Sequence, residues 1–407
     1  MKGNKLKKLL IVMAAAGAVS MTSGVLAKPD SIKIGGLYIL SGSAASYGEF
    51  ASQGMNLAIS EINETGGVLG KPLELILEDD QGKAATGIQA ARKLVYQDKV
   101  SALVGIDSSG VALGLVPVLE ELETPLIITH AATPDATGKL CNKYAYRISV
   151  NENQNMRAAA ELASTTKAKR WTTIGPDYAF GHDSWELFGE YLKEIDPDVV
   201  LMKEVAFPKF GAEDFTPFIN NIMTHNPEGI LISVWGGDLV NFVRQANNLG
   251  FFDKGYEIMF TVGAATEALS ALGEQMPEGV WLGTRYWYDS HDTDINKKFV
   301  QDYRQKYKTA PSYNAEGAYS AVYAIKGALE KAGSTDPKAV AAALEGLSLN
   351  TPAGQRTFRV GDNQAVIGPT WGRAASMSDD GIRSLAEVRN FDGESVSLPL
   401  ERTGCKR

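Results

Sequence analysis

The sequence is poor in the residues that build reactive and metal-binding sites. Its 407 residues include two cysteines and only four histidines, His130, His182, His225 and His291. The histidines lack the spacing of metal ligands on a helix and no cysteine cluster accompanies them, so the usual zinc and iron motifs are excluded. The sequence also lacks a Gly-x-Ser-x-Gly turn and a Gly-x-Gly-x-x-Gly loop after the first predicted strand, the marks of acyl hydrolases and dinucleotide-binding enzymes. We predict no metal, no cofactor and no catalytic activity.

Basic residues do not predominate. Lys and Arg number 40 against 48 Asp and Glu, which gives a formal net charge of -8 at pH 7. A chain that is acidic overall is a poor partner for a polyanion, so we exclude nucleic acid. Hydrophobic residues make up 44% of the chain, enough to fill the cores of two domains of ordinary size.

A single long apolar run is present, and it lies near the N-terminus. Four lysines and no acid precede the apolar stretch from Leu9 to Val19, and the segment ends in small residues up to Ala27. This order is typical of a cleaved export signal, so we predict that residues 1–27 are the signal and that the mature protein begins near Lys28. Because no cysteine follows the apolar core, we expect release into a periplasm without a lipid anchor.

The two cysteines, Cys141 and Cys405, would enter an oxidising compartment after export. A disulfide between them would tie down the C-terminal tail. Two unpaired thiols are the alternative, because the sequence does not show whether the side chains lie within bonding distance.

Strand-like and helix-like segments alternate from Ile32 onward, which predicts a parallel sheet flanked by helices. Such a sheet needs right-handed crossover connections. The first series comprises predicted strands 32–40, 73–78, 100–105 and 125–129 and predicted helices 48–63, 84–97 and 111–122.

A second series of the same kind begins after residues 146–148. Its predicted strands are 171–175, 199–205, 229–234, 257–261 and 279–283, and its predicted helices are 153–165, 184–195, 215–224 and 239–249. The rest of the chain predicts helices 294–307, 314–331 and 337–345, a strand 356–360 and a β-like tail. The late helices need a sheet to cover.

The predicted fold class is therefore α/β, with two Rossmann-like lobes whose parallel sheets are flanked by helices, joined by a three-strand hinge. We expect the chain to return to the first lobe after Gly283 and to cross again near Phe358. The predicted first lobe consists of residues 28–149 and 284–357, and the second of residues 150–283 and 358–407.

A glycine-rich helix end carries a resemblance to a known family. Residues 62–72, Ile-Asn-Glu-Thr-Gly-Gly-Val-Leu-Gly-Lys-Pro, close a helix on glycines and lead into residues 75–80, Leu-Ile-Leu-Glu-Asp-Asp, in the next predicted strand. Together with Leu40-Ser41-Gly42 and Tyr47-Gly48, this segment resembles the branched-chain amino acid (Leu/Ile/Val-binding) family of ABC transporter substrate-binding proteins, which are type I periplasmic binding proteins. The resemblance implies solute binding, and an ABC permease as the membrane partner.

Two turns at the carboxyl ends of neighbouring predicted strands suit an anion. Ser108 and Ser109 follow one strand, and Ala131, Ala132 and Thr133 follow the next. Open α/β sheets bind ligands at this edge, where hydroxyls and free backbone N–H groups gather. The resemblance implies that these turns hold the carboxylate of the ligand. Helix capping is the alternative role for the serines.

Three aromatic residues are expected to line the site. The family pattern of an aromatic residue before glycine is present as Phe180-Gly181, and Trp235 follows a later strand. Tyr47 would form the opposite wall. Aromatic walls with a few polar anchors are typical of small-molecule sites. Ordinary core packing is the alternative for Phe180 and Trp235.

Val262 stands where branched-chain amino acid receptors carry an acid for the ligand's ammonium group. An unpaired buried ammonium is costly, so we predict a carboxylate ligand without an amine. The run Tyr-Trp-Tyr at 286–288 favours an aromatic one. An amino acid is the alternative, with Asp177, Asp238 or Glu316 supplying the missing charge.

The predicted function is the capture of a small carboxylate by closure of the two lobes, followed by delivery to the permease. Arg285 is a further candidate, as the group that receives a second carboxylate. Ligand favours the closed form because both lobes contact it only then. We expect a monomer. A sensor that reports ligand occupancy to a signalling partner is the alternative function for the same fold.

Overall fold

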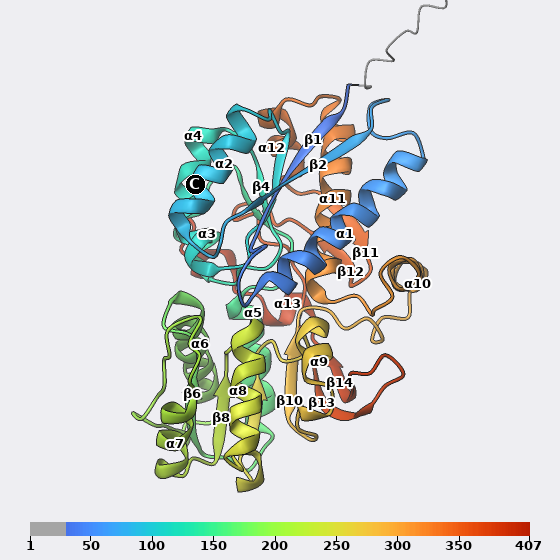
Figure 1. The fold of residues 1–407 in the computed structure, drawn as a ribbon. Helices are drawn as coiled ribbons and strands as arrows, with labels where there is room; N and C mark the ends of the chain where they lie inside the picture. Colours follow the sequence, from blue (N-terminus) through green and yellow to red (C-terminus); the bar gives the residue numbers. More distant parts are fainter. Residues whose placement is uncertain (1–29) are drawn as a thin grey trace, which may run out of the picture.

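Two β-sheets with helices on both faces form two lobes, one above the other in Figure 1. The computed structural model describes residues 30–407, so the predicted export signal at 1–27 lies outside the described residues. The predicted α/β class with two lobes is confirmed.

The first lobe contains a five-stranded sheet in the order β2-β1-β3-β4-β5, in which all neighbouring strands run parallel. Its strands are β1 (Ile32–Tyr38), β2 (Leu73–Asp79), β3 (Ala102–Gly105), β4 (Leu126–Ile128) and β5 (Ala145–Arg147). The helices of this part of the chain are α1 (Ala45–Glu64), α2 (Ala84–Tyr96), α3 (Ser109–Leu115) and α4 (Leu119–Leu122). The later helices α10 (Asp294–Tyr307), α11 (Tyr313–Ala332) and α12 (Pro337–Leu344) join them, and α11 packs along α1.

Successive residues of each strand face opposite sides of this sheet, as a period of two requires. In β1, Ile34 belongs to the core under α1 and α11, whereas Leu37 belongs to the core under α2 and α3. In β3, Val104 and Leu103 divide in the same way. Burial on both faces explains why these strands are apolar throughout instead of alternating with polar residues.

The second lobe contains a seven-stranded sheet in the order β14-β13-β10-β9-β8-β6-β7. Its strands run parallel except that β13 pairs antiparallel with both β10 and β14. The strands are β6 (Arg170–Ile174), β7 (Val200–Leu201), β8 (Gly229–Ile232), β9 (Glu257–Phe260), β10 (Trp281–Thr284), β13 (Thr370–Met377) and β14 (Arg383–Asn390). The helices are α5 (Glu152–Ser164), α6 (Ala179–Ile195), α7 (Thr216–His225), α8 (Gly236–Asn248), α9 (Thr266–Leu272) and α13 (Gly393–Val396).

Two strands of the structure differ from the predicted ones. The strand predicted at 199–205 is reduced to the two residues of β7, which lies at the sheet edge and pairs only with β6 among the described strands. The strand predicted at 356–360 is instead one arm of a hairpin formed by β11 (Ser348–Thr351) and β12 (Gly354–Thr357). Gly354 has a φ of 107°, a conformation that glycine adopts easily, where this hairpin reverses.

The chain passes between the lobes after β5, after β10 and after β12. Gln364 connects the first and third of these passages. Its Oε1 accepts hydrogen bonds from Arg147 Nη1 and Thr137 Oγ1, at 3.1 and 3.0 Å, and its Nε2 donates to the carbonyl of Ser149 at 2.8 Å. The hinge is therefore held by a buried side chain as well as by backbone pairing.

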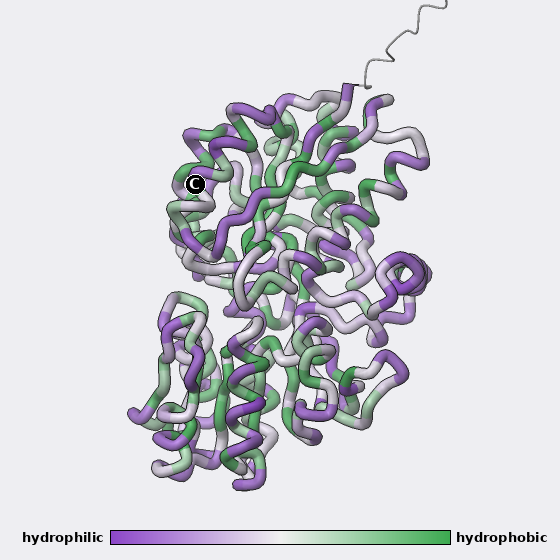
Figure 2. Tube along the Cα trace, viewed as in Figure 1, coloured by the Kyte–Doolittle hydropathy of each residue, from purple (hydrophilic) through white to green (hydrophobic). Residues whose placement is uncertain are grey.

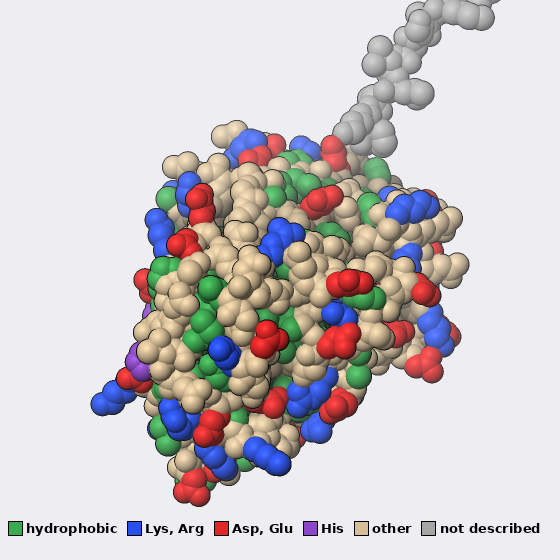
Figure 3. Space-filling view, turned by 60° about the horizontal axis from the view of Figure 1, so that its bottom comes forward, with side chains coloured by type: hydrophobic (Ala, Val, Ile, Leu, Met, Phe, Trp, Pro, Cys, Tyr) green, Lys and Arg blue, Asp and Glu red, His purple; other side chains and the backbone are tan. Residues whose placement is uncertain are grey.

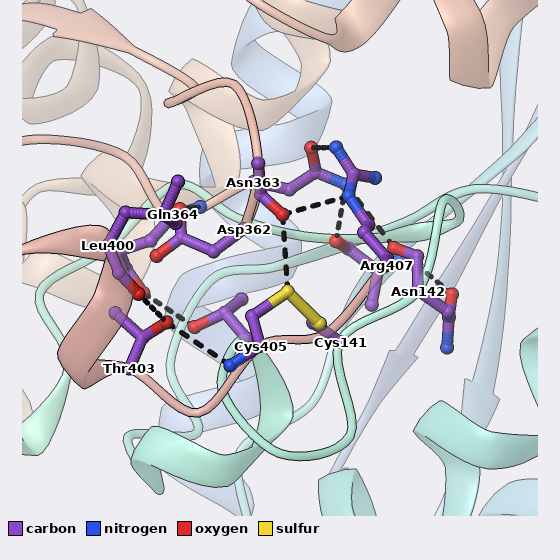
Figure 4. Close-up of a disulfide and its surroundings, with 12 residues drawn as sticks. Cys141, Asn142, Asp362, Asn363, Gln364, Leu400, Thr403, Cys405 and Arg407 are labelled. Carbon is purple, nitrogen blue, oxygen red and sulfur yellow. Dashed lines mark hydrogen bonds between the residues drawn. A yellow bond between two sulfur atoms is a disulfide. The ribbon is translucent and has the colours of Figure 1, made fainter.

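The C-terminal tail returns to the first lobe. Val396 is buried in the core of the second lobe, and Gln154 Nε2 donates to Ser397 Oγ at 2.9 Å. Cys405 is then disulfide-bonded to Cys141, with the Cα atoms 5.5 Å apart (Figure 4). The predicted disulfide is thus present. The segment between Ser397 and Cys405 thus links the second lobe to Cys141 of the first.

The surface and the interior differ as this architecture requires. In Figure 2 the strands inside both lobes are mainly hydrophobic, whereas the outer helices alternate between hydrophobic and hydrophilic residues. Figure 3 shows acidic and basic side chains interspersed on the face presented, without a continuous basic patch. Within residues 30–407, no helix is long and apolar enough to cross a membrane.

Candidate functional site

The predicted site residues lie in the loops that follow strands of both sheets and in the first turns of α1, α3 and α6. This edge of a parallel sheet is where α/β proteins place their ligands. Each of the predicted residues is buried, with at most 7% of its surface exposed. They are Tyr47, Ser108, Ser109, Ala131, Ala132, Thr133, Phe180, Trp235, Val262 and Arg285.

The second lobe contacts the first directly at the beginning of α8. The first N–H groups of a helix have no partner within the helix. Here the N–H of Gly236 donates to Tyr47 Oη at 3.3 Å, and the N–H of Gly237 donates to the carbonyl of Ser43 at 3.0 Å. The two lobes are therefore in direct contact here, through hydrogen bonds that the first N–H groups of α8 donate.

Five aromatic rings meet in this region, and we call them the aromatic cluster: Tyr47, His130, Phe210, Trp235 and Tyr313. Tyr47 stacks on His130 at a centroid distance of 5.3 Å and meets Trp235 edge-on at 5.2 Å. Trp235 stacks on Phe210 at 4.9 Å, and Tyr313 meets His130 edge-on at 5.3 Å. The first lobe supplies three of the rings and the second lobe two, so closure brings flat apolar surfaces together.

Phe180 is more remote than predicted, and Tyr178 lies closer to the aromatic cluster. The Phe180 ring contacts only Tyr178 among the described rings, at 6.5 Å. Tyr178 meets Phe210 at 6.0 Å and accepts a hydrogen bond from Trp235 Nε1 at 2.8 Å. Tyr178 was not among the predicted residues, because the prediction rested on the aromatic-glycine pair Phe180-Gly181. The signal that could have found it is its position immediately before α6, at the exit of β6.

Asp107, His130 and Tyr313 form a buried chain of hydrogen bonds. His130 Nδ1 lies 3.1 Å from Asp107 Oδ1, and His130 Nε2 lies 3.1 Å from the Tyr313 hydroxyl. Burial, together with the charge of Arg285, lowers the pKa of His130 well below its ordinary value. A neutral imidazole satisfies both contacts if Nδ1–H donates to Asp107 and Nε2 accepts from Tyr313. Both ring nitrogens of His130 are therefore engaged within the protein.

The two predicted anion-binding turns are joined to each other. Thr133 N–H donates to Ser109 Oγ at 3.1 Å, across neighbouring strand ends. Ser108 stands at the N-cap of α3, but its side chain makes no capping hydrogen bond. Capping, the alternative role for these serines, is therefore absent at Ser108. Burial raises the pKa of Tyr178, and the nearby Trp235 and Ser108 side chains act in the opposite direction.

Arg285 is a buried cation in the same region. It is 5% exposed and follows β10, at the second passage between the lobes. Its Nη1 donates to the carbonyl of His130, and its guanidinium lies over the Tyr313 ring at 5.3 Å. Its Nε has no hydrogen-bond partner among the described residues. A guanidinium with a free donor in a desolvated cleft is suited to a carboxylate.

The three acids considered as partners for a ligand amine are engaged elsewhere. Asp177 is a surface residue whose side chain is 61% exposed and bonds to His182 at 2.9 Å. Asp238 is buried, and its Oδ2 accepts from the N–H of Gly211 at 2.7 Å. Glu316 forms a buried ion pair with Arg356 at 2.5 Å.

Glu267 is a buried acid that the sequence analysis missed. It lies in the first turn of α9, five residues beyond Val262, and is 5% exposed. Its Oε1 accepts a hydrogen bond from Asn314 Nδ2, and burial raises its pKa to about 7. Its charge acts on both Tyr47 and Tyr313 of the aromatic cluster. The family resemblance points to position 262 and therefore does not indicate Glu267.

Glu152 is a second buried acid that the sequence analysis did not identify. It is the first residue of α5, and its N–H donates to the carbonyl of Ala132 at 2.9 Å. Its carboxylate accepts from Ser184 Oγ at 2.7 Å. Burial raises the pKa of Glu152 to about 7, while the Ser184 bond and the charge of Arg285 act in the opposite direction. Glu152 therefore lies within electrostatic range of Arg285.

Comparison with known proteins gives a consistent result. A family model described as periplasmic binding protein matches residues 31–374. A leucine-, isoleucine-, valine-, threonine- and alanine-binding protein of Pseudomonas aeruginosa is 26% identical over 355 residues, which cover 87% of this chain and 91% of that protein.

Two solved structures are similar over most of their length. An amino acid ABC transporter substrate-binding protein from Pseudomonas fluorescens Pf-5 is 25% identical with a TM-score of 0.78, and the match covers 93% of this chain and 99% of that one. A solute-binding protein of an ABC transporter from Rhodopseudomonas palustris BisB5, in complex with 3,4-dihydroxybenzoic acid, is 24% identical with a TM-score of 0.80, and the match covers 89% and 98%.

Proposed function

We propose that this chain, which belongs to the periplasmic binding protein family, holds a small carboxylate between its lobes. It is a substrate-binding component of an ABC transporter and not an enzyme. Export by the N-terminal segment, without a lipid anchor, would place the protein in the periplasm. Ligand would enter an open form and favour closure, because only the closed form brings both lobes into contact with it.

The observation that carries this proposal is Arg285. It is a buried guanidinium, 5% exposed, with one N–H direction unused by the described residues. A buried cation needs an anionic partner to offset its desolvation, and a carboxylate matches the planar fork of the guanidinium. Ser108, whose hydroxyl does not cap α3, is a nearby neutral donor for the same carboxylate.

The aromatic cluster supports a ligand with a planar, unsaturated body. Tyr47 and His130 form a stacked face in the first lobe, and Trp235 and Phe210 form another in the second. Val262 is buried and apolar, which favours a carboxylate without an amine beside it. We therefore propose an aromatic, amine-free carboxylate as the first candidate ligand.

An amino acid is the second candidate, and Glu267 is the observation that favours it. This buried acid is the group that could balance a ligand ammonium which Val262 cannot. Similar proteins support both candidates. The Pseudomonas aeruginosa protein is named for binding amino acids, and the Rhodopseudomonas palustris protein is in complex with 3,4-dihydroxybenzoic acid.

A thermal-shift and calorimetric screen tests the proposal. Ligands that bind the native state raise its melting temperature. The mature protein is tested against benzoate, 3-phenylpropanoate, phenylalanine and leucine, in the wild type and in Arg285→Gln. We expect at least one carboxylate to bind and Arg285→Gln to weaken it by ~10-fold or more.

The matched control is Arg92→Gln, because Arg92 is a surface residue paired with Glu121 at 2.9 Å. It should leave affinity unchanged. Binding of carboxylates that is equal in Arg285→Gln and in the wild type would refute the role of Arg285. Binding of neutral amides as tightly as of the matching acids would refute the carboxylate proposal itself.

A further inference from the structure

Glu267 and Asn314 meet between the lobes, and each has an unused acceptor. Glu267 belongs to α9 of the second lobe, and Asn314 belongs to the first turn of α11, which packs on the first lobe. Asn314 Nδ2 donates to Glu267 Oε1. No described group meets Glu267 Oε2 or Asn314 Oδ1 at hydrogen-bonding geometry.

Both unused oxygens are deeply buried. Glu267 is 5% exposed and Asn314 is 1% exposed. Buried acceptors in native proteins are almost always paired, because an unpaired one loses its bonds to water without compensation. Two such oxygens on adjoining side chains therefore indicate a place for a group that donates hydrogen bonds.

The protein does not fill this place from its own neighbouring groups. Ser312 caps α11, where its Oγ accepts from the N–H of Asn314 at 3.2 Å. Burial raises the pKa of Glu267 and the nearby Ser312 opposes that shift, but no hydrogen bond of proper geometry joins Ser312 to Oε2. The Tyr313 hydroxyl is bonded to His130 Nε2 at 3.1 Å. The Tyr303 hydroxyl donates to Gln53 Oε1 at 2.5 Å.

The acceptor pair adjoins the groups assigned to the ligand. Asn314 follows Tyr313 in the sequence, and the Tyr313 ring lies under the Arg285 guanidinium at 5.3 Å. Burial raises the pKa of Tyr47, and the charges of Tyr313 and Glu267 act in the same direction, so the Glu267 carboxylate lies within electrostatic range of the aromatic cluster. Arg285 and the acceptor pair thus both lie in the neighbourhood of Tyr313.

We propose that Glu267 and Asn314 form a specificity-determining subsite that accepts hydrogen bonds from a donor group on the ligand, a hydroxyl or an ammonium, while Arg285 receives its carboxylate. This inference rests on the proposed function and makes it more specific. The subsite is assembled from both lobes, so it exists only in the closed form. A ligand without a donor leaves both acceptors unpaired and is rejected for that reason.

Three matched ligands separate the two kinds of donor. The acid 3-phenylpropanoate has no donor besides its carboxyl group, 3-(4-hydroxyphenyl)propanoate adds a hydroxyl, and phenylalanine adds an ammonium. Their affinities are measured by calorimetry for the wild type, Glu267→Ala, Glu267→Gln and the control Glu194→Gln, which changes an exposed acid on α6. Circular dichroism establishes that each variant is folded.

We expect one donor-bearing ligand to bind wild type at least ~10-fold more tightly than 3-phenylpropanoate, and Glu267→Ala to remove that advantage. Glu267→Gln keeps an acceptor but loses the charge. Glu267→Gln should strongly reduce the affinity for a ligand with an ammonium group and reduce the affinity for a ligand with a hydroxyl group by a smaller factor. The difference identifies the donor, and it can be measured even if Glu267→Ala does not fold.

Equal losses for donor-bearing and donor-free ligands in both Glu267 variants would overturn the inference. So would wild-type affinities that are no greater for the donor-bearing ligands. Either result leaves the proposed function standing as long as a carboxylate binds through Arg285. Failure of every carboxylate to bind is a different outcome, which refutes the proposed function and the subsite together.

Discussion

The backbone N–H of Gly237 donates a hydrogen bond to the carbonyl of Ser43, 3.0 Å away, and this bond joins the second lobe to the first. A Cβ atom built on Gly237 would lie 2.5 Å from that carbonyl oxygen and 2.9 Å from Ser43 Cβ. Two backbones can approach this closely only where one of them is glycine.

Gly237→Ala should therefore hinder closure without removing any group proposed to touch the ligand. If the closed form becomes ten times less populated, the apparent affinity falls about ten-fold. Calorimetry measures the affinity, and small-angle scattering with ligand present measures closure. Gly327→Ala is the control, because a Cβ there meets nothing nearer than Leu347 at 3.6 Å. Unchanged affinity in Gly237→Ala would mean that closure tolerates the extra atom.

Trp235→Ala should strongly weaken ligand binding while the protein stays folded. Trp235 is 2% exposed and contacts Tyr47 and Phe210, so its removal opens the second-lobe face of the aromatic cluster. Loss of one such ring typically weakens binding by 2 kcal/mol or more, about 30-fold. Tyr96→Ala, at an exposed ring, is the control. Retained affinity in Trp235→Ala and in Thr133→Ala would rule out the proposed location of the site.

Stability should depend on pH through Glu152, whose pKa burial raises to about 7. An acid whose pKa is raised on folding is protonated in the folded state at pH 5 and is forced to ionise there at pH 8. The folded state thus loses stability as pH rises from the ordinary carboxyl range through about 7. Glu152→Gln cannot ionise and escapes this loss.

The free energy of unfolding of Glu152→Gln, relative to wild type, should therefore be higher at pH 8 than at pH 5. Urea unfolding at the two pH values gives this difference. Glu194→Gln, at an exposed position, should show none. A difference between wild type and Glu152→Gln that does not change with pH would show that Glu152 keeps the same protonation in the folded state throughout this range.

Removal of the disulfide should lower stability. A cross-link between residues as far apart as Cys141 and Cys405 stabilises mainly by restricting the unfolded chain, typically by about 2–4 kcal/mol. The double variant Cys141→Ser with Cys405→Ser should melt at a lower temperature than wild type. Reductant should lower the melting temperature of wild type toward that of the variant and leave the variant itself unchanged.

Most of the fold could be predicted from the sequence because its signals are local. The apolar strands, of which Ile34 and Leu37 are examples, and the amphipathic helices between them follow from the periodicity of side chains. β7 could not be bounded in this way, since strand length at a sheet edge depends on how many residues find a partner. The pairing of β11 with β12 likewise depends on a turn and not on the pattern of either strand.

The site was only partly predictable, for a physical reason. Tyr47, Trp235 and Arg285 adjoin strand or helix ends, and the topology of a parallel sheet brings such positions to one edge. Glu267 and Asn314 instead become neighbours through the rotation of two helices and the closure of two lobes. No spacing in the sequence encodes those rotations. Glu267, five residues after Val262, was therefore not predicted as a site residue.

The bond between Cys141 and Cys405 closes the polypeptide into a ring of covalent bonds. Every residue from 142 to 404 lies inside that ring, and the whole second lobe with it. A single cut by a protease anywhere in this span therefore yields a nicked molecule that remains one covalent unit until the disulfide is reduced. The same topology brings a domain fused after Arg407 next to the hinge on the first lobe, since the Arg407 side chain bonds to the carbonyl of Gly361 at 2.9 Å.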